Sequence, residues 1–376
     1  MNRKELILLL LGVTVIGAVS LGVFKRNASS WQQTNSAQGK VLNDFALNEV
    51  AQIEIKSAQS DLNLIKKDNR WCVKERANYP ASFEQVSDLV RKLWELKAVQ
   101  TVDVGPSQLG RLNLLEPGPD AKSAGTVVDL KDTNGVRIRA LLVGKKYLRE
   151  TPGMDEGQGY PAGRYVMALG PERQPVLVGD ALTQTESSAA QWLDHDFFKV
   201  EHIKSVAVTG TSAETSWKLS RETETSDWKL ADLKSGEELD QGKVPVFASQ
   251  LAFPAFADVQ TQDQPLDNPT SVEVETFNGF TYSLKFGSSS IGDNLPMKIA
   301  ISANLATERP AGKDEKPEEK KRLDEQFAAN AKELQSKLEK EKQLEPRTFL
   351  VAKGGFESFF KKRSELMAEK KTAQAK

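Results

Sequence analysis

Short runs of alternating apolar and polar residues recur through most of the chain. The run QIEIK at 52–56 alternates as a half-buried strand does, and LNLIKKDNRWCV at 62–73 predicts a hairpin. A later run, SWKLSRETETSDWKL at 216–230, has the same design: two short strands, a polar turn, and a tryptophan opening the second strand. Trp71 and Trp228 are therefore interpreted as paired structural positions, each anchoring its hairpin to the helix behind it.

A helix is predicted after each hairpin. In the first half it covers 82–97, where Ser82 can cap the helix and Gln85 stands three residues later, as in a capping box. Its apolar face repeats at helical spacing and consists of Val86, Leu89, Val90, Leu93, Trp94 and Leu96. The second half has a shorter candidate, VFASQLAF at 246–253. The first helix should lie on the sheet formed by the strands before it.

Each half continues with a predicted meander of strands that turns at an Asn-Gly pair, a strong hairpin signal. The pairs are Asn134-Gly135 and Asn278-Gly279. The predicted strands of the first meander are 126–130, 136–144, 164–169 and 175–179, and those of the second lie within 271–287, 297–302 and 347–352. Because the elements follow in one order, the sequence predicts two related α+β repeats of antiparallel sheet plus helix, at 41–192 and 193–360.

The second repeat carries a charged insertion, 308–346, where the first has only the short loop GPERQ at 170–174. After Pro317 the insertion predicts a long helix with a narrow apolar stripe, of the kind found in coiled coils, formed by Leu323, Phe327, Ala331, Leu334 and Leu338. Such a stripe suits either a partner-docking surface or packing along the protein's own domain. Both interpretations stay open. The chain ends in a basic tail, 361–376.

The N-terminal region contains 19 consecutive residues without a charge, LILLLLGVTVIGAVSLGVF at 6–24. As a helix this run would be about 28 Å long, which matches one bilayer crossing. The sequence therefore predicts a transmembrane anchor at 1–27, followed by a flexible linker at 28–40. A cleaved signal peptide is the alternative. We expect attachment to the cell inner membrane, with the folded body on the periplasmic side.

Small residues recur every four positions within that run, at Thr14, Ala18 and Gly22. This spacing allows two transmembrane helices to approach closely, so the three residues are a candidate helix-packing face. Ordinary small-residue content of a single-pass anchor is the other interpretation.

Charge and cysteine content narrow the function classes. Lys and Arg number 51 against 52 Asp and Glu, so the chain has no positive excess that would favour nucleic-acid binding. A single cysteine, Cys72, excludes a disulfide within the chain. The length favours two domains.

Few residues of the sequence form a pattern that indicates a chemical activity. Both histidines, His195 and His202, lie in WLDHDFFKVEH at 192–202 beside several acidic residues. A polar linker between the two halves is favoured there over a metal site. The chain has no G-x-S-x-G motif and no glycine-rich phosphate loop. No catalytic, cofactor-binding or metal-binding residue is predicted.

Several of these features occur together in a known family. The hairpin ending at Trp71, the Tyr-Pro-Ala step at 79–81, the helix after it and the D-x-D-F entry at 194–197 follow in an order that resembles the bacterial domain of unknown function 4340 family. The resemblance implies a single-span envelope protein, often encoded beside components of a gliding-motility-type ABC transporter, without established catalytic residues. The insertion 308–346 departs from that pattern.

Two hypotheses of different classes result. The first is a non-enzymatic accessory or scaffold protein of the bacterial cell envelope, associated with an ABC-type transport system or another envelope protein and bound to the membrane through 6–24. The second is a ligand-binding or hydrolytic envelope domain with its site between the two repeats.

Overall fold

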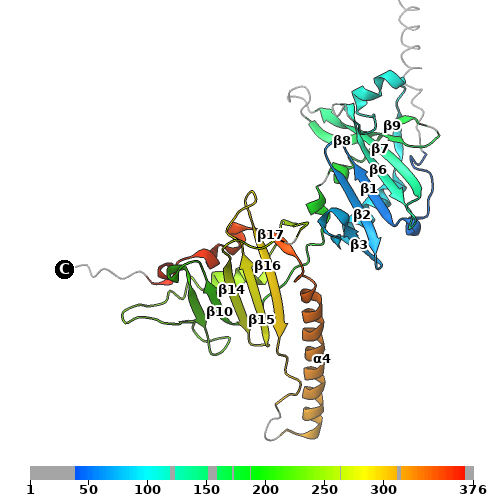
Figure 1. Cartoon of the computed structure of the whole chain (residues 1–376). Helices are drawn as coiled ribbons and strands as arrows, with labels where there is room; N and C mark the ends of the chain where they lie inside the picture. The colour runs from blue at the N-terminus through cyan, green and yellow to red at the C-terminus, as the bar shows by residue number, and fades with distance from the viewer. Residues whose placement is uncertain are drawn as a thin grey trace, which may run out of the picture. The chain divides into compact units, whose positions relative to one another are not determined.

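The computed structural model describes residues 39–118, 123–150, 159–171, 173–186, 188–262, 264–310 and 315–368. The chain divides into two compact units, one formed by Met1–Glu75 with Pro80–Trp192 and the other by Arg76–Tyr79 with Leu193–Lys376. A large antiparallel sheet dominates each unit (Figure 1).

The first sheet has nine strands in the order β4-β3-β2-β1-β6-β7-β8-β9-β5. Its elements are β1 (Gln52–Lys56), β2 (Asp61–Lys67), β3 (Arg70–Val73), β4 (Tyr79–Pro80), α2 (Phe83–Glu95), β5 (Ala98–Thr101), β6 (Thr126–Lys131), β7 (Arg137–Glu150), β8 (Gly159–Ala168) and β9 (Pro175–Val178).

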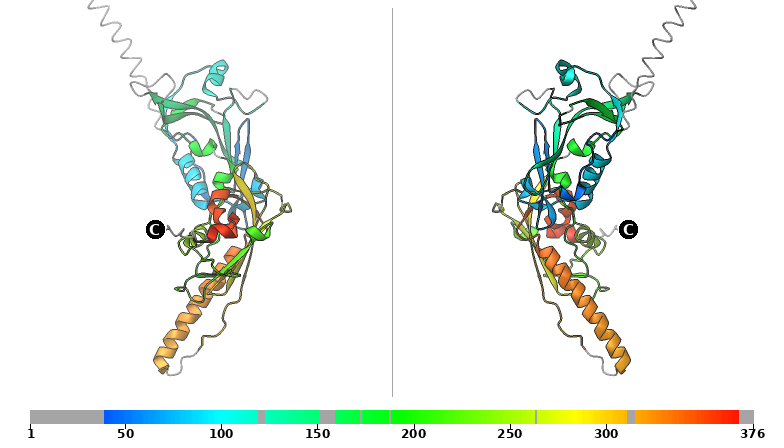
Figure 2. Two further views of the ribbon diagram at one scale, coloured as in Figure 1. Left: turned by 90° about the vertical axis from the view of Figure 1, so that its left-hand side faces the viewer. Right: turned by 90° about the vertical axis from the view of Figure 1, so that its right-hand side faces the viewer.

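Alternation explains how β1 and β2 enter the core, since Ile53, Ile55, Leu62 and Leu64 are buried while their neighbours along each strand are not. Helix α2 lies against one face of this sheet (Figure 2) and buries Val86, Leu89, Val90 and Leu93. The Ser82 side chain accepts a hydrogen bond from the Gln85 backbone N–H. The predicted helix and its cap are confirmed.

The second sheet has eight strands in the order β12-β11-β10-β14-β15-β16-β17-β13. Its elements are β10 (Ile203–Thr209), β11 (Trp217–Ser220), β12 (Lys229–Leu230), α3 (Pro245–Ala252), β13 (Asp258–Val259), β14 (Thr270–Thr276), β15 (Phe280–Phe286), β16 (Asn294–Ala303), α4 (Pro317–Lys342) and β17 (Thr348–Ala352). Residues 361–368, the start of the predicted basic tail, pack on this unit, with Leu366 buried and Arg363 paired with Glu237.

The two sheets correspond strand by strand. In the first sheet the order is the hairpin β3-β2, then β1, the meander β6-β7-β8, and finally β9 and β5. In the second sheet it is the hairpin β12-β11, then β10, the meander β14-β15-β16, and finally β17 and β13. The last strand of each order, β5 or β13, comes before the meander in sequence. The helix in each half lies between the hairpin and that last strand, as α2 before β5 and α3 before β13. Only β4 has no counterpart in the second sheet.

The predicted fold class is wrong. An α+β fold with an N-terminal transmembrane helix and sheet-plus-helix repeats was expected, but the described chain is mostly antiparallel sheet with few helices. The helices that accompany the two sheets are short, with 13 residues in α2 and eight in α3, and the one long helix of the described chain, α4, belongs to the insertion. Among the described residues, none of the helices combines the length and apolar character needed to cross a bilayer. The run 6–24 lies outside the described residues.

The interpretation of Trp228 also needs correction. Trp71 is buried in β3, as expected. Trp228 lies just before β12, is half-buried, and stacks against the Arg221 guanidinium at 4.9 Å. The tryptophan that packs on the second helix is Trp217, whose ring lies 5.0 Å from that of Phe247 in α3. Its indole N–H also donates to the Lys361 carbonyl at 3.1 Å.

Candidate functional site: the groove beside α4

The insertion that contains α4 contacts the sheet beside the part of β16 that does not pair with β17. β17 pairs with β16 only from Asn294 to Lys298, so the rest of β16 lacks a neighbouring strand on that side. Glu345, just after α4, accepts a hydrogen bond from the backbone N–H of Ile301 at 2.8 Å. The C-terminal end of the insertion therefore covers an otherwise open strand edge, which would be a liability if left exposed.

A buried carboxylate fixes α4 to its unit. Glu341 is only 5% exposed, and its two oxygens accept hydrogen bonds from the Lys199 backbone N–H at 3.0 Å and from the Tyr282 hydroxyl at 2.8 Å. Burial raises the pKa of Glu341, although these hydrogen bonds and the nearby Lys337 oppose the increase. Burial, followed by the Glu341 charge, also raises the pKa of Tyr282.

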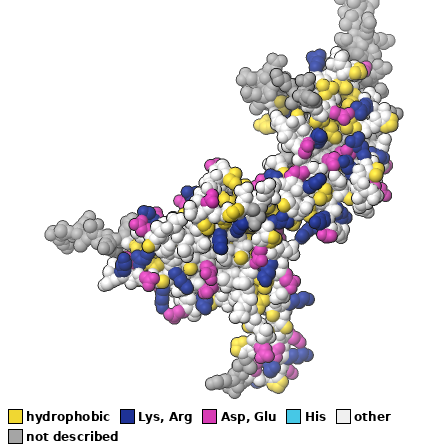
Figure 3. All heavy atoms as spheres, in the orientation of Figure 1, with side chains coloured by type: hydrophobic (Ala, Val, Ile, Leu, Met, Phe, Trp, Pro, Cys, Tyr) yellow, Lys and Arg dark blue, Asp and Glu magenta, His cyan; other side chains and the backbone are white. Residues whose placement is uncertain are grey.

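The N-terminal half of α4 extends beyond the sheet (Figures 1 and 2). Along this helix, acidic and basic side chains lie on the surface with apolar side chains between them (Figure 3). Arg309, in the segment leading to the helix, pairs with Glu315 and with Asp324, the latter at 3.0 Å. These ion pairs link Arg309 to a residue just before α4 and to the helix itself.

The predicted docking stripe lies on the side of α4 that faces its own unit. Leu338 is buried, whereas Leu323, Phe327, Ala331 and Leu334 are half-buried. Three of these, Phe327, Ala331 and Leu334, line a cavity of about 220 Å³ together with Leu305, Ala306 and the turn between β14 and β15. The stripe is thus only partly covered, which leaves both of its interpretations open.

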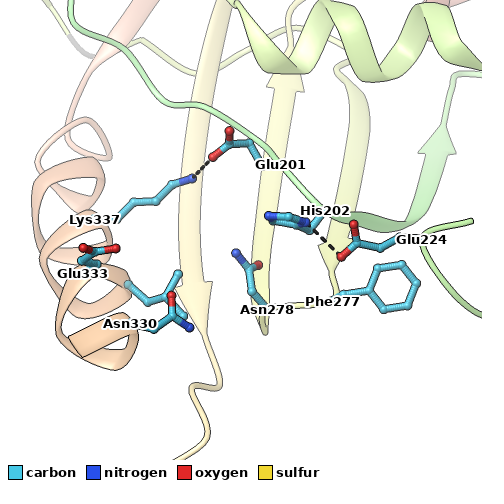
Figure 4. A pocket seen from close by; sticks show the side chains of 9 residues that line it. Glu201, His202, Glu224, Phe277, Asn278, Asn330, Glu333 and Lys337 are labelled. Carbon is cyan, nitrogen blue, oxygen red and sulfur yellow. Dashed lines mark hydrogen bonds and ion pairs between the residues drawn. The ribbon is translucent and has the colours of Figure 1, made fainter. Parts of the chain in front are cut away.

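A second, more polar cavity of about 410 Å³ adjoins the first (Figure 4). The two share Phe277, Asn278, Asn330 and Leu334, so they form one groove, here called the α4 groove, between α4 and the end of the sheet. Its polar end is lined by Glu201, His202, Glu224, Glu333 and Lys337.

Two pairs of side chains organise the polar end (Figure 4). His202 Nδ1 lies 2.9 Å from Glu224 Oε1, and Lys337 Nζ lies 3.9 Å from Glu201 Oε2. The pKa of Glu201 is lowered, mainly by the hydrogen bond that it accepts from the Lys199 side chain. His202 has a φ of +54°, a left-handed conformation that is uncommon for a residue other than glycine and that often marks functional sites.

The remaining predicted residues lie elsewhere. His195 packs against the Phe256 ring at 4.9 Å, and Cys72 is buried. Across the described ranges, no group of three or more His, Cys, Asp and Glu side chains is arranged to hold a metal ion. Thr14, Ala18 and Gly22 belong to residues 1–38, outside the described part of the chain.

Sequence reasoning did not find Glu224, Asn278, Asn330 and Glu333 as groove residues. Those on α4 had a signal, because Asn330 and Glu333 flank Ala331 and Leu334 of the apolar stripe at helical spacing. Glu224 and Asn278 come from a loop and a turn that only the folded sheet brings to the same place.

The fold and the groove define a protein with two antiparallel sheets of one topology, of which the second carries a helical insertion. The chain belongs to the family described as Domain of unknown function (DUF4340), whose model matches residues 71–269, from β3 to the segment before β14. Helix α4 lies outside the matched residues. No curated protein and no solved structure matches the chain.

Proposed function

We propose that the protein is an accessory or scaffold protein of the bacterial cell envelope that holds a partner protein, such as a subunit of an ABC-type transport system, against the α4 side of its second unit. One observation carries the proposal: α4 extends beyond the sheet with an apolar stripe that its own unit covers only partly. The first sheet completes the same strand order without such a helix.

The geometry of α4 supports a binding role better than a purely structural one. Only its C-terminal end, at Leu338 and Glu341, is buried against the sheet. The N-terminal half adds exposed surface that the strand edge does not need, and functional surfaces concentrate on such additions to a rigid scaffold. Ion pairs of Arg309 with Glu315 and Asp324 tie this half to the segment before it.

The envelope location rests on the uncharged run 6–24 and on the family resemblance. Membrane attachment through that run would keep the protein at the membrane in which transporter subunits lie. We expect the full chain to fractionate with membranes and to resist extraction by carbonate. Recovery of the full-length chain in the soluble fraction would contradict this part of the proposal.

Affinity purification tests the partner. The tagged full chain is purified from detergent-solubilised membranes after mild crosslinking, alongside a variant in which 308–346 is replaced by Gly-Pro-Glu-Arg-Gln, the connecting loop of the first unit. We expect envelope proteins to co-purify with the natural chain and to be lost from the variant. Equal recovery with both chains would overturn the role of α4.

A further inference from the structure

The α4 groove has two chemically different ends on one continuous surface. Its apolar end is formed by Phe327, Ala331, Leu334 and Leu305. Its polar end carries three carboxylates, Glu201, Glu224 and Glu333. Because the two cavities share four lining residues, a single extended chain segment can occupy both at once.

Charge gives the groove a preference. Of the three carboxylates, Glu201 is paired with Lys199 and Lys337, and Glu224 with His202. Glu333 has no hydrogen bond or ion pair within the described residues, nor has the Asn330 side chain one turn before it. The polar end therefore offers a carboxylate and an amide that have no partner within the described residues, and these suit a cationic group and a peptide backbone.

We propose, building on the function proposed above, that the α4 groove binds an extended segment of the partner protein in which an apolar side chain is closely followed by a lysine or arginine. The apolar side chain occupies the end lined by Phe327 and Leu334. The cationic side chain lies against Glu333, and Asn330 binds the backbone between them. An acidic segment would meet the carboxylates unfavourably, so charge also selects against wrong partners.

A peptide series tests the inference on the detergent-solubilised full chain. Fluorescein-labelled heptapeptides carry Leu, Phe or Ser at one position and Lys, Arg, Gln or Glu at a distance of one to three residues, and fluorescence anisotropy measures binding. We expect the Leu-Lys and Phe-Arg members to bind most tightly. Replacement of the basic residue by Glu should weaken binding by about tenfold or more.

Two groove variants and one control sharpen the result. Glu333→Lys should reverse the preference, so that peptides with Glu bind better than peptides with Lys. Leu334→Ala should weaken binding of Leu and Phe peptides while keeping the charge preference. Glu325→Lys, at another exposed position of α4 that does not line the groove, should leave binding unchanged. Thermal unfolding of each variant checks that it folds.

The outcomes separate the two proposals. If no peptide binds above the Ser-Gln member, or if binding is insensitive to both groove variants, the groove inference is wrong. Binding that depends on Glu333 but not on the apolar residue would also overturn it, and would indicate a site for a small cation instead. Partner recovery that needs α4 but is unaffected by the groove variants would leave the proposed function standing and this inference refuted.

Discussion

The connections β8–β9 and β16–β17 occupy the same place in two sheets of one strand order, yet they differ greatly. The first crosses in residues 169–174, whereas the second runs from 304 to 347 and contains α4. Both pairs of strands form an antiparallel ladder, so the longer connection is not required to close the sheet. The comparison indicates that the fold supplies a scaffold and that the insertion supplies the surface specific to the second unit.

The insertion has nevertheless become part of its unit. Glu341 accepts a hydrogen bond from the backbone N–H of Lys199, before β10, and Glu345 accepts one from the backbone of β16. Leu338 and Leu344 are buried. An added segment that covers an open strand edge is hard to remove without cost. The two connections therefore differ in how much they stabilise their units as well as in the surface that they present.

Exchange of the connection gives the largest expected effect. Replacing 308–346 by Gly-Pro-Glu-Arg-Gln removes Leu338 and Leu344 from the core, each worth about 1.5–3 kcal/mol. We expect the free energy of unfolding to fall by about 3–6 kcal/mol with the sheets retained, measured by urea unfolding and circular dichroism. A variant that cannot fold at all would mean that the insertion belongs to the essential core and would break the comparison.

The two Asn-Gly turns provide a matched pair of substitutions. Gly135 and Gly279 both have positive φ, at +78° and +89°. A Cβ at 135 meets nothing within 4 Å, but at 279 it would lie 2.3 Å from the Asn304 carbonyl oxygen. We expect Gly135→Ala to cost about 1–2 kcal/mol and Gly279→Ala about 3 kcal/mol or more. Equal losses in denaturant unfolding would show that the second turn has room to relax.

The helix behind each hairpin differs in its cap. Ser82 caps α2 through its side chain, whereas α3 has no side-chain cap. Ser82→Ala should lower the free energy of unfolding by about 1 kcal/mol. Ser87→Ala, within the same helix, is the control and should be neutral or slightly stabilising, since alanine has the higher helix propensity. Similar losses for both would exclude the cap as the cause.

The smallest expected effect is a pH dependence from Glu341. Because its pKa is raised in the folded state, the folded chain holds this proton more tightly than the unfolded chain. Its contribution to stability therefore declines as pH rises from the ordinary value of 4.5 to the raised value and is constant above it. Relative to Glu341→Gln, the natural chain should lose stability over that window in urea unfolding series. A relative gain would contradict the assignment.

Local features were predictable because their signals are local. The cap at Ser82, the hairpin ending at Trp71 and the long helix after Pro317 all appear where spacing and turn residues placed them. The role given to Trp228 failed because the choice of which tryptophan packs on α3 depends on how the whole unit folds, and Trp217 and Phe247 meet instead. The predicted fold class was wrong because the two helical patterns at 82–97 and 246–253 were given the same weight as the many strands.

The groove was only half visible in the sequence. Periodicity identified the apolar stripe on α4, but not which surface would face it. Glu224 lies in the loop after β11 and comes close to the turn at Asn278 because β11 pairs with β10 and β10 pairs with β14, the latter a contact between residues far apart in sequence. A site assembled from five separate segments has no signature in any one of them.

Photo-crosslinking in living cells tests the central claim most directly. A benzoylphenylalanine is placed at Ala328, an exposed position next to the stripe on α4, or at Arg173, an exposed position in the corresponding connection of the first unit. We predict that Ala328 captures a defined envelope protein on irradiation and that Arg173 does not. Capture of the same protein from both positions, or from neither, would contradict the claim that the insertion makes the second unit the partner-binding one.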